Sequence, residues 1–324
     1  MHHFAIVPPE LALEPSQFIG IPLALIAAVF LSLGTQYQNR GVRKVEANTE
    51  SARGRGLNFG QLALLFARPS WVSGTVLLAL AILFQLSSLY FSPLIMVQPL
   101  GAIALVVTAI LSSRVAKTRL NRASIVAISM CVGGVFVFVG VAAFTTVNTP
   151  ISDQQLIIVL SALGALLLAL GVFFLTMRRR IRLLFYVIAA GVLYGFVATL
   201  AKVVLGRIQQ GDFEWLTLFC LAGLLAAVLL GAYFVQNANS AGPPDMVVAG
   251  LTVIDPMVAV LIGVVVLGEA ALAPPWAIVA FVLTGACATG GVFLLARHHP
   301  QLDAGSQQNA TPHSAGSTGQ GVAR

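Results

Sequence analysis

The sequence predicts an all-α polytopic membrane protein of about nine transmembrane helices. Composition is the first reason, because 58% of the 324 residues are hydrophobic and only 9% are charged, against about 25% charged residues in an ordinary soluble domain. The second reason is a series of apolar stretches, each near the length of about 20 residues that a helix needs to cross the hydrocarbon core. The third is the distribution of basic residues between the intervening loops.

The apolar stretches cover about residues 18–39, 71–91, 93–113, 122–144, 154–177, 183–205, 214–236, 246–268 and 275–297. Their apolar residues run continuously instead of alternating, so they predict helices and not the strands of a barrel. We therefore divide the chain into an extracytoplasmic segment (1–17), a first half (18–144), an extracytoplasmic linker (145–153), a second half (154–297) and a disordered cytoplasmic tail (298–324).

The longest loop, residues 41–70, is predicted to be cytoplasmic and to contain a short interfacial helix at about 57–67. The loops after the first, third and fifth spans, together with the carboxyl-terminal side, hold 16 of the 18 Lys and Arg residues. Basic residues gather on the cytoplasmic side of a membrane protein, so we predict the amino terminus outside the inner (cytoplasmic) membrane and the carboxyl terminus in the cytoplasm. The net charge of +7 then reflects topology, and no nucleic-acid partner is expected.

An internal duplication relates the two halves. A shift of 157 residues places Pro99 on Pro256 and Ala102 on Ala259, and it places the segment 133–136 on the identical segment 290–293. The two copies are five spans apart, so they cross the membrane in opposite directions. Inverted repeats are typical of secondary transporters, whose substrate site lies near the midplane between the repeats.

The repeated prolines mark the place where we expect this site. Gln98-Pro99 and Asp255-Pro256 occupy equivalent positions, and a proline inside a helix removes one backbone hydrogen bond. Interrupted helices at both positions would free carbonyl groups for a substrate. The alternative is a simple packing kink.

Asp255 is the strongest single candidate, because an ionised carboxylate near the middle of a membrane helix costs about 3 kcal/mol. We expect it to bind a coupling proton or a cationic substrate; the alternative is a structural ion pair with Lys202. Glu269 is expected to be solvated where the eighth span ends. The substrate or ion path is predicted to include seven further residues: Thr252, Pro256, Gln98, Pro99, Gln85, Gln236 and Lys202.

Motifs for ATP, dinucleotides or hydrolytic chemistry are absent from the sequence. The histidines and cysteines show no metal-site spacing. We therefore expect neither an enzyme nor a resident cofactor or metal. Membrane lipids are the expected surroundings, and a homodimer is left open.

Residues 90–139, which contain "SPLIMVQPLGAIALV", resemble the drug/metabolite transporter superfamily and, within it, the NIPA-like magnesium transporters with their "APAxLVxPLGAL" segment. Residues 236–269, with their Gly-Pro, Asp-Pro and Leu-Gly-Glu features, resemble the last third of EamA-type permeases. The resemblance implies an inverted-repeat fold of ten helices, reduced to nine in the NIPA-like group, that works by alternating access. Asp255 departs from the NIPA-like pattern, which has an uncharged residue before this proline.

The function that these observations favour is secondary, proton-coupled transport of a small metabolite. Three alternatives stay open at this point: a Mg²⁺ or other cation transporter, a flippase for a lipid-linked sugar or polyprenyl carrier, and a non-transporting scaffold for cell-envelope enzymes. Magnesium is favoured by the resemblance, but Mg²⁺ often uses more than one carboxylate and the first half has no acid at membrane depth.

Overall fold

The computed structural model describes residues 18–47, 68–116, 121–146, 148, 150–177, 183–211, 214–242 and 244–297. Within these residues, nine helical segments are long and apolar enough to cross a membrane, which confirms the predicted all-α membrane fold. The predicted interfacial helix at 57–67, the amino-terminal segment 1–17 and the tail 298–324 lie outside the described residues.

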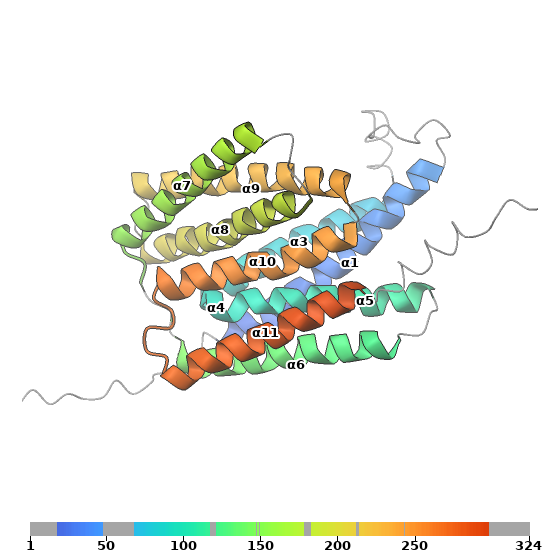
Figure 1. The fold of residues 1–324 in the computed structure, drawn as a ribbon, viewed down its shortest axis with the longest axis horizontal. Helices are drawn as coiled ribbons and strands as arrows, with labels where there is room; N and C mark the ends of the chain where they lie inside the picture. Colours follow the sequence, from blue (N-terminus) through green and yellow to red (C-terminus); the bar gives the residue numbers. More distant parts are fainter. Residues whose placement is uncertain are drawn as a thin grey trace, which may run out of the picture.

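Eight of the spans are single helices. They are α1 (Gly20–Ala47), α3 (Pro69–Phe91), α6 (Arg122–Thr145), α7 (Asp153–Met177), α8 (Leu183–Gln210), α9 (Trp215–Ala241), α10 (Pro244–Val265) and α11 (Pro275–Arg297). Prolines begin three of them, as expected for a residue whose missing N–H costs nothing in the first turn. The long helices run in roughly one direction, with α7 and α9 at one edge of the bundle and α6 and α11 at the other (Figure 1).

The remaining span is interrupted, as the repeated prolines predict for this position. It consists of α4 (Leu94–Val97), the 3-10 turn η2 (Gln98–Gly101) and α5 (Ala102–Ala116). The equivalent proline behaves differently, because α10 continues as an α-helix through Pro256. The expectation of two symmetric interruptions is therefore wrong: one span changes from an α-helix to a 3-10 turn at its proline, and the other accommodates the proline within an α-helix.

The contact between α6 and α11 has a symmetry that matches the sequence duplication. A Cβ atom on Gly134 of α6 would lie 2.7 Å from the backbone nitrogen of Ala288, and one on Gly291 of α11 would lie 2.5 Å from that of Cys131. Gly134 and Gly291 differ by 157 residues, and so do Cys131 and Ala288. The contact of Gly134 with Ala288 thus has a repeat-related copy in the contact of Gly291 with Cys131, as expected where two antiparallel helices meet on a pseudo-twofold axis.

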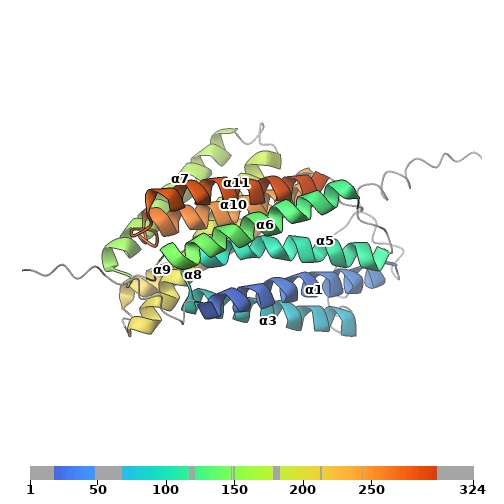
Figure 2. The same cartoon turned by 90° about the horizontal axis from the view of Figure 1, so that it is seen from below.

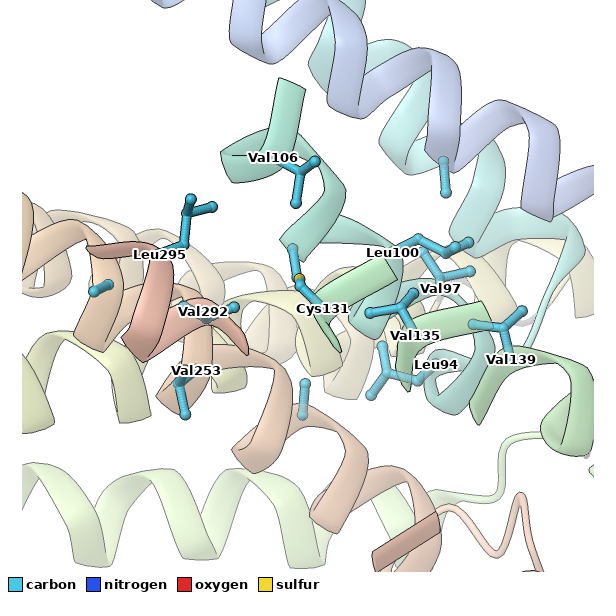
Figure 3. Packing of buried hydrophobic residues seen from close by; sticks show 14 of the residues in the cluster. Leu94, Val97, Leu100, Val106, Cys131, Val135, Val139, Val253, Val292 and Leu295 are labelled. Carbon is cyan, nitrogen blue, oxygen red and sulfur yellow. The ribbon is translucent and has the colours of Figure 1, made fainter. Parts of the chain in front are cut away.

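The packing of the other helices is compatible with the same relation. Helix α1 packs mainly against α3, and its counterpart α8 packs mainly against α9. The largest buried cluster joins the halves, because it includes Leu94 and Val97 of α4, Val135 of α6, Val253 of α10 and Val292 of α11 (Figure 3). Figure 2 shows α5 between the pair α6 and α11 and the pair α1 and α3. The interrupted span therefore lies at the centre of the bundle, with its break near the cavity described next.

Candidate functional site

A cavity of about 390 Å³ lies between α1, α3, the interrupted span, α8 and α10. The 3-10 turn contributes Gln98 and Gly101 to its wall, and α10 contributes Thr252, Asp255 and Pro256. Both members of the repeated pair Gln98 and Asp255 therefore line one cavity, although they are far apart in the sequence. Leu31 and Ile82 also line it and are 44% and 61% exposed, so the cavity reaches the surface of the bundle at α1 and α3.

Asp255 is the acid of this cavity. Its atom Oδ1 is buried and has no hydrogen-bond partner among the described residues. Neutral polar side chains share the wall, namely Gln85 of α3, Gln98 of η2, Tyr194 of α8 and Thr252 of α10. The hydroxyl of Thr252 donates to the carbonyl of Val248 at 2.8 Å, so its proton is used within the helix while its oxygen can still accept a hydrogen bond. A buried carboxylate oxygen without a partner is costly, and a cation or a proton would relieve that cost.

The structure brings together five of the predicted path residues and separates the others. Gln85, Gln98, Thr252, Asp255 and Pro256 line the cavity. Gln236 lies on an exposed face of α9, away from the cavity, because the face of a helix that turns inward depends on its neighbours. Pro99 forms the turn η2 without being part of the wall.

Lys202 does not pair with Asp255. Its ammonium group donates to the carbonyls of Leu89 at 2.8 Å and Ser92 at 2.9 Å and to Oδ1 of Asn148 at 2.8 Å. These acceptors lie at the end of α3 and in the segment after α6, and they hold the ammonium at one end of the cavity. The alternative of an Asp255–Lys202 ion pair is therefore not what the structure shows.

Glu269 is buried and not solvated, which corrects the expectation from its place at the end of the eighth span. The side chain is 2% exposed, and its two oxygens accept hydrogen bonds from the backbone N–H groups of Leu94 at 2.7 Å and Ile95 at 2.8 Å. Gly268 has a φ of +70°, a left-handed conformation that glycine adopts without a steric penalty. The chain thus turns back after α10 and places Glu269 against the start of α4.

Burial raises the pKa of the Glu269 carboxyl, and the charge of Lys202 and the two N–H donors oppose this shift because they stabilise the anion. Sequence reasoning missed this residue, and the one available signal was the glycine that precedes it. No group of three or more His, Cys, Asp or Glu side chains that could hold a metal ion occurs within the described residues. A cation in the cavity would therefore have Asp255 as its one carboxylate ligand, together with neutral oxygens.

Comparison with known proteins identifies relatives of this chain. The family model described as magnesium transporter NIPA matches residues 16–211. An uncharacterized protein of Corynebacterium glutamicum is 25% identical over 259 residues, which are 78% of this chain and 86% of that protein. The probable magnesium transporter NIPA1 of Arabidopsis thaliana is 26% identical over 122 residues, which are 38% of this chain and 35% of that protein.

A probable magnesium transporter of Candida albicans is 27% identical over 118 residues, which are 36% of this chain and 31% of that protein. The matched region thus spans about a third of the plant and yeast relatives. No solved structure matches the chain.

Proposed function

Because the chain belongs to the magnesium transporter NIPA family and is a membrane transporter, we propose that it carries Mg²⁺ through the cavity at Asp255. The observation that carries this proposal is the buried Oδ1 of Asp255, which has no hydrogen-bond partner among the described residues and belongs to a residue of the cavity wall. Oδ1 itself has almost no accessible surface, so a rotation of the Asp255 side chain would bring this oxygen to a cation in the cavity and supply the partner that it lacks.

The size and lining of the cavity fit a hydrated divalent cation better than a bare one. Mg²⁺ prefers six oxygen ligands and commonly keeps several waters while it binds one or two carboxylates. Six waters occupy about 180 Å³ at about 30 Å³ each, and the cavity has room for about 390 Å³. Gln85, Gln98 and Tyr194 can then hold the waters through hydrogen bonds while Asp255 supplies the negative charge.

The interrupted span contributes a side-chain oxygen to the site, because its 3-10 turn η2 places Gln98 in the cavity wall. The carbonyl that Pro99 deprives of its helical donor belongs to Ile95, which is fully buried and does not line the cavity. The antiparallel α6–α11 contact then supports alternating access, in which the halves rock about the site.

A second candidate is proton-coupled transport of a small metabolite. It is favoured by the apolar part of the wall, which includes Leu86, Leu89 and Leu251, because hydrated Mg²⁺ has no use for apolar contacts. In this case Asp255 would carry the coupling proton or pair with an amine. A lipid-linked substrate stays an untested prediction. The scaffold alternative requires a packed interior with Asp255 in an ion pair, and the cavity and the position of Lys202 argue against it.

The test is Mg²⁺ uptake into liposomes that contain the purified protein and a Mg²⁺-sensitive dye. We expect uptake above that of empty liposomes, abolished in Asp255→Asn and retained in Asp153→Asn. Asp153 is a matched control because its side chain is 59% exposed and does not line the cavity. If a pH gradient drives uptake of an organic cation while Mg²⁺ uptake stays at the empty-liposome rate, proton-coupled metabolite transport replaces Mg²⁺ transport as the function.

A further inference from the structure

The end of the bundle that carries the α10–α11 loop is closed by two buried charged side chains, Glu269 and Lys202. They are 2% and 6% exposed, and both hold backbone groups of the first half although they belong to the second. Glu269 accepts from the first N–H groups of α4, and Lys202 donates to the carbonyl of Leu89 in the last turn of α3 and to that of Ser92, which directly follows α3. Together they therefore provide hydrogen-bond partners for backbone groups on both sides of the short connection between α3 and α4.

This layer lies directly against the cavity. Leu89, whose carbonyl accepts from Lys202, and Ala201, which precedes Lys202 in α8, are both residues of the cavity wall. Asn148, the third acceptor of Lys202, also donates to the carbonyl of Phe91 at 3.2 Å. Helix α3 and the segment after α6 are thus joined to α8 at this end of the cavity.

The opposite end of the first half has a different chemistry. Within the described residues, α1 and α5 are joined there by neutral bonds, Gln36 to Ser112 and Ser32 to Thr108, each 2.7 Å long. Ser112 occupies the position that the shift of 157 residues assigns to Glu269. The duplication has therefore placed a buried acid at one end of the path and a hydroxyl at the other.

We propose that Glu269 and Lys202 form the gate at this end, closed in the present conformation and opened when the two halves separate. Glu269 acts as the positioning residue that ties the α10–α11 loop to α4, and Lys202 ties α8 to α3. This proposal rests on the alternating-access part of the proposed function and not on the identity of the ion. Opening costs the hydrogen bonds of both charges, so weakening either one shifts the population toward the state open at this end.

The test measures the access of a thiol reagent to the cavity, which requires no substrate. Gly101→Cys provides the reporter, because Gly101 lines the cavity and a Cβ there meets no atom within 4 Å. The native residues Cys131, Cys220 and Cys287 are first replaced by alanine. A membrane-impermeant maleimide is then applied from the side of the α10–α11 loop and, separately, from the other side.

We expect Glu269→Gln and Lys202→Met each to raise the labelling rate from the loop side by about tenfold or more, since a hydrogen bond to a charged group is worth that factor. Matched controls are Glu214→Gln, an exposed acid at the same end, and Gln209→Met, whose side chain also joins α8 to an α3 carbonyl. Folded gate variants that label at the parental rate, or controls that label as fast as the gate variants, would overturn the proposal.

A disulfide across the gate keeps the proposal testable if the gate variants fail to fold. A Cβ on Gly263 would lie 3.5 Å from Cβ of Leu94, which is within the range that a disulfide requires, and 2.9 Å from Oε2 of Glu269, so the Glu269 side chain must shift to admit it. In Leu94→Cys/Gly263→Cys, oxidation should stop Mg²⁺ uptake and a reductant should restore it. Uptake that continues unchanged with the disulfide formed would refute the gate. Absence of Mg²⁺ uptake in the reduced protein would instead count against the proposed function, and labelling of the gate variants that do fold would then decide the gate.

Discussion

The close contact between α6 and α11 makes a sharp prediction for two adjacent pairs of glycines. In each pair one glycine faces the other helix and its neighbour does not. A Cβ on Gly134 or Gly291 would lie within 2.9 Å of at least two backbone atoms of the facing helix, whereas one on Gly133 meets no atom within 4 Å and one on Gly290 meets only the end of Met130 at 3.6 Å. Substitution by alanine should therefore lower the free energy of unfolding at Gly134 and Gly291 but not at Gly133 and Gly290.

The magnitude follows from the contact distances. Carbon atoms in van der Waals contact lie about 3.5 Å apart, so a Cβ at 2.5 Å from the nitrogen of Cys131 requires the helix backbones to separate by about 1 Å. Backbone cannot rotate aside as a side chain can, and overpacking of this kind costs about 1–3 kcal/mol. We expect this loss for Gly291→Ala and for Gly134→Ala. For Gly290→Ala and Gly133→Ala we expect no loss, or a gain of up to about 1 kcal/mol from helix propensity.

The assay is reversible unfolding of the purified protein by sodium dodecyl sulfate in mixed micelles, followed by circular dichroism. The two tight positions should show equal losses within error, because the pseudo-twofold axis makes their surroundings equivalent. The reasoning would be refuted if Gly291→Ala were as stable as Gly290→Ala. A loss at one tight position without a loss at the other would argue against the symmetry.

Three further predictions concern the charged and polar groups. Gln98→Glu adds a second carboxylate to the cavity at the position equivalent to Asp255 and should tighten Mg²⁺ binding by about tenfold, as expected for a Mg²⁺ site with two carboxylates. Titration calorimetry measures this affinity, with Gln236→Glu as the control outside the cavity. Equal Mg²⁺ affinities of the two variants would contradict the prediction. Lys202→Met leaves two buried carbonyls without their charged donor and should lower the free energy of unfolding by about 1–3 kcal/mol, measured by the same detergent titration; an unchanged midpoint would contradict the contacts of this residue. Asp153→Asn removes the charge that pairs with Arg207 at 2.8 Å, and the Arg207 side chain is only 6% exposed although Asp153 is 59% exposed. The loss should therefore be about 1–3 kcal/mol, and an unchanged free energy of unfolding would contradict a contribution of this pair to stability.

The spans were predictable from sequence because each depends on a local run of apolar residues. The meeting of Gln98 and Asp255 in one cavity was also predictable, since the repeat relates both residues to one place. Glu269 was not, because its burial depends on a turn at Gly268 and on backbone N–H groups more than 170 residues away along the chain. The continuity of α10 through Pro256 likewise depends on neighbouring helices, which local rules do not describe.

The position of Lys202 illustrates the same limit from the other side. Charge and depth made it a reasonable partner for Asp255, and in the structure its ammonium group donates hydrogen bonds to three neutral oxygens at the end of the cavity instead. Gln236 lies on the exposed side of α9 because hydropathy alone does not determine which face of an apolar helix turns inward. The sequence therefore determines the spans, but it does not determine the pairwise contacts between distant residues.

The proposed function requires Asp255 to be the carboxylate to which the transported cation binds. Binding of Mn²⁺ as a paramagnetic substitute for Mg²⁺, counted by electron paramagnetic resonance on the purified protein, tests it most directly. We predict one bound Mn²⁺ per chain, which Mg²⁺ displaces, which is absent in Asp255→Asn and which is unchanged in Asp153→Asn. One Mn²⁺ bound to Asp255→Asn with the parental affinity would contradict it.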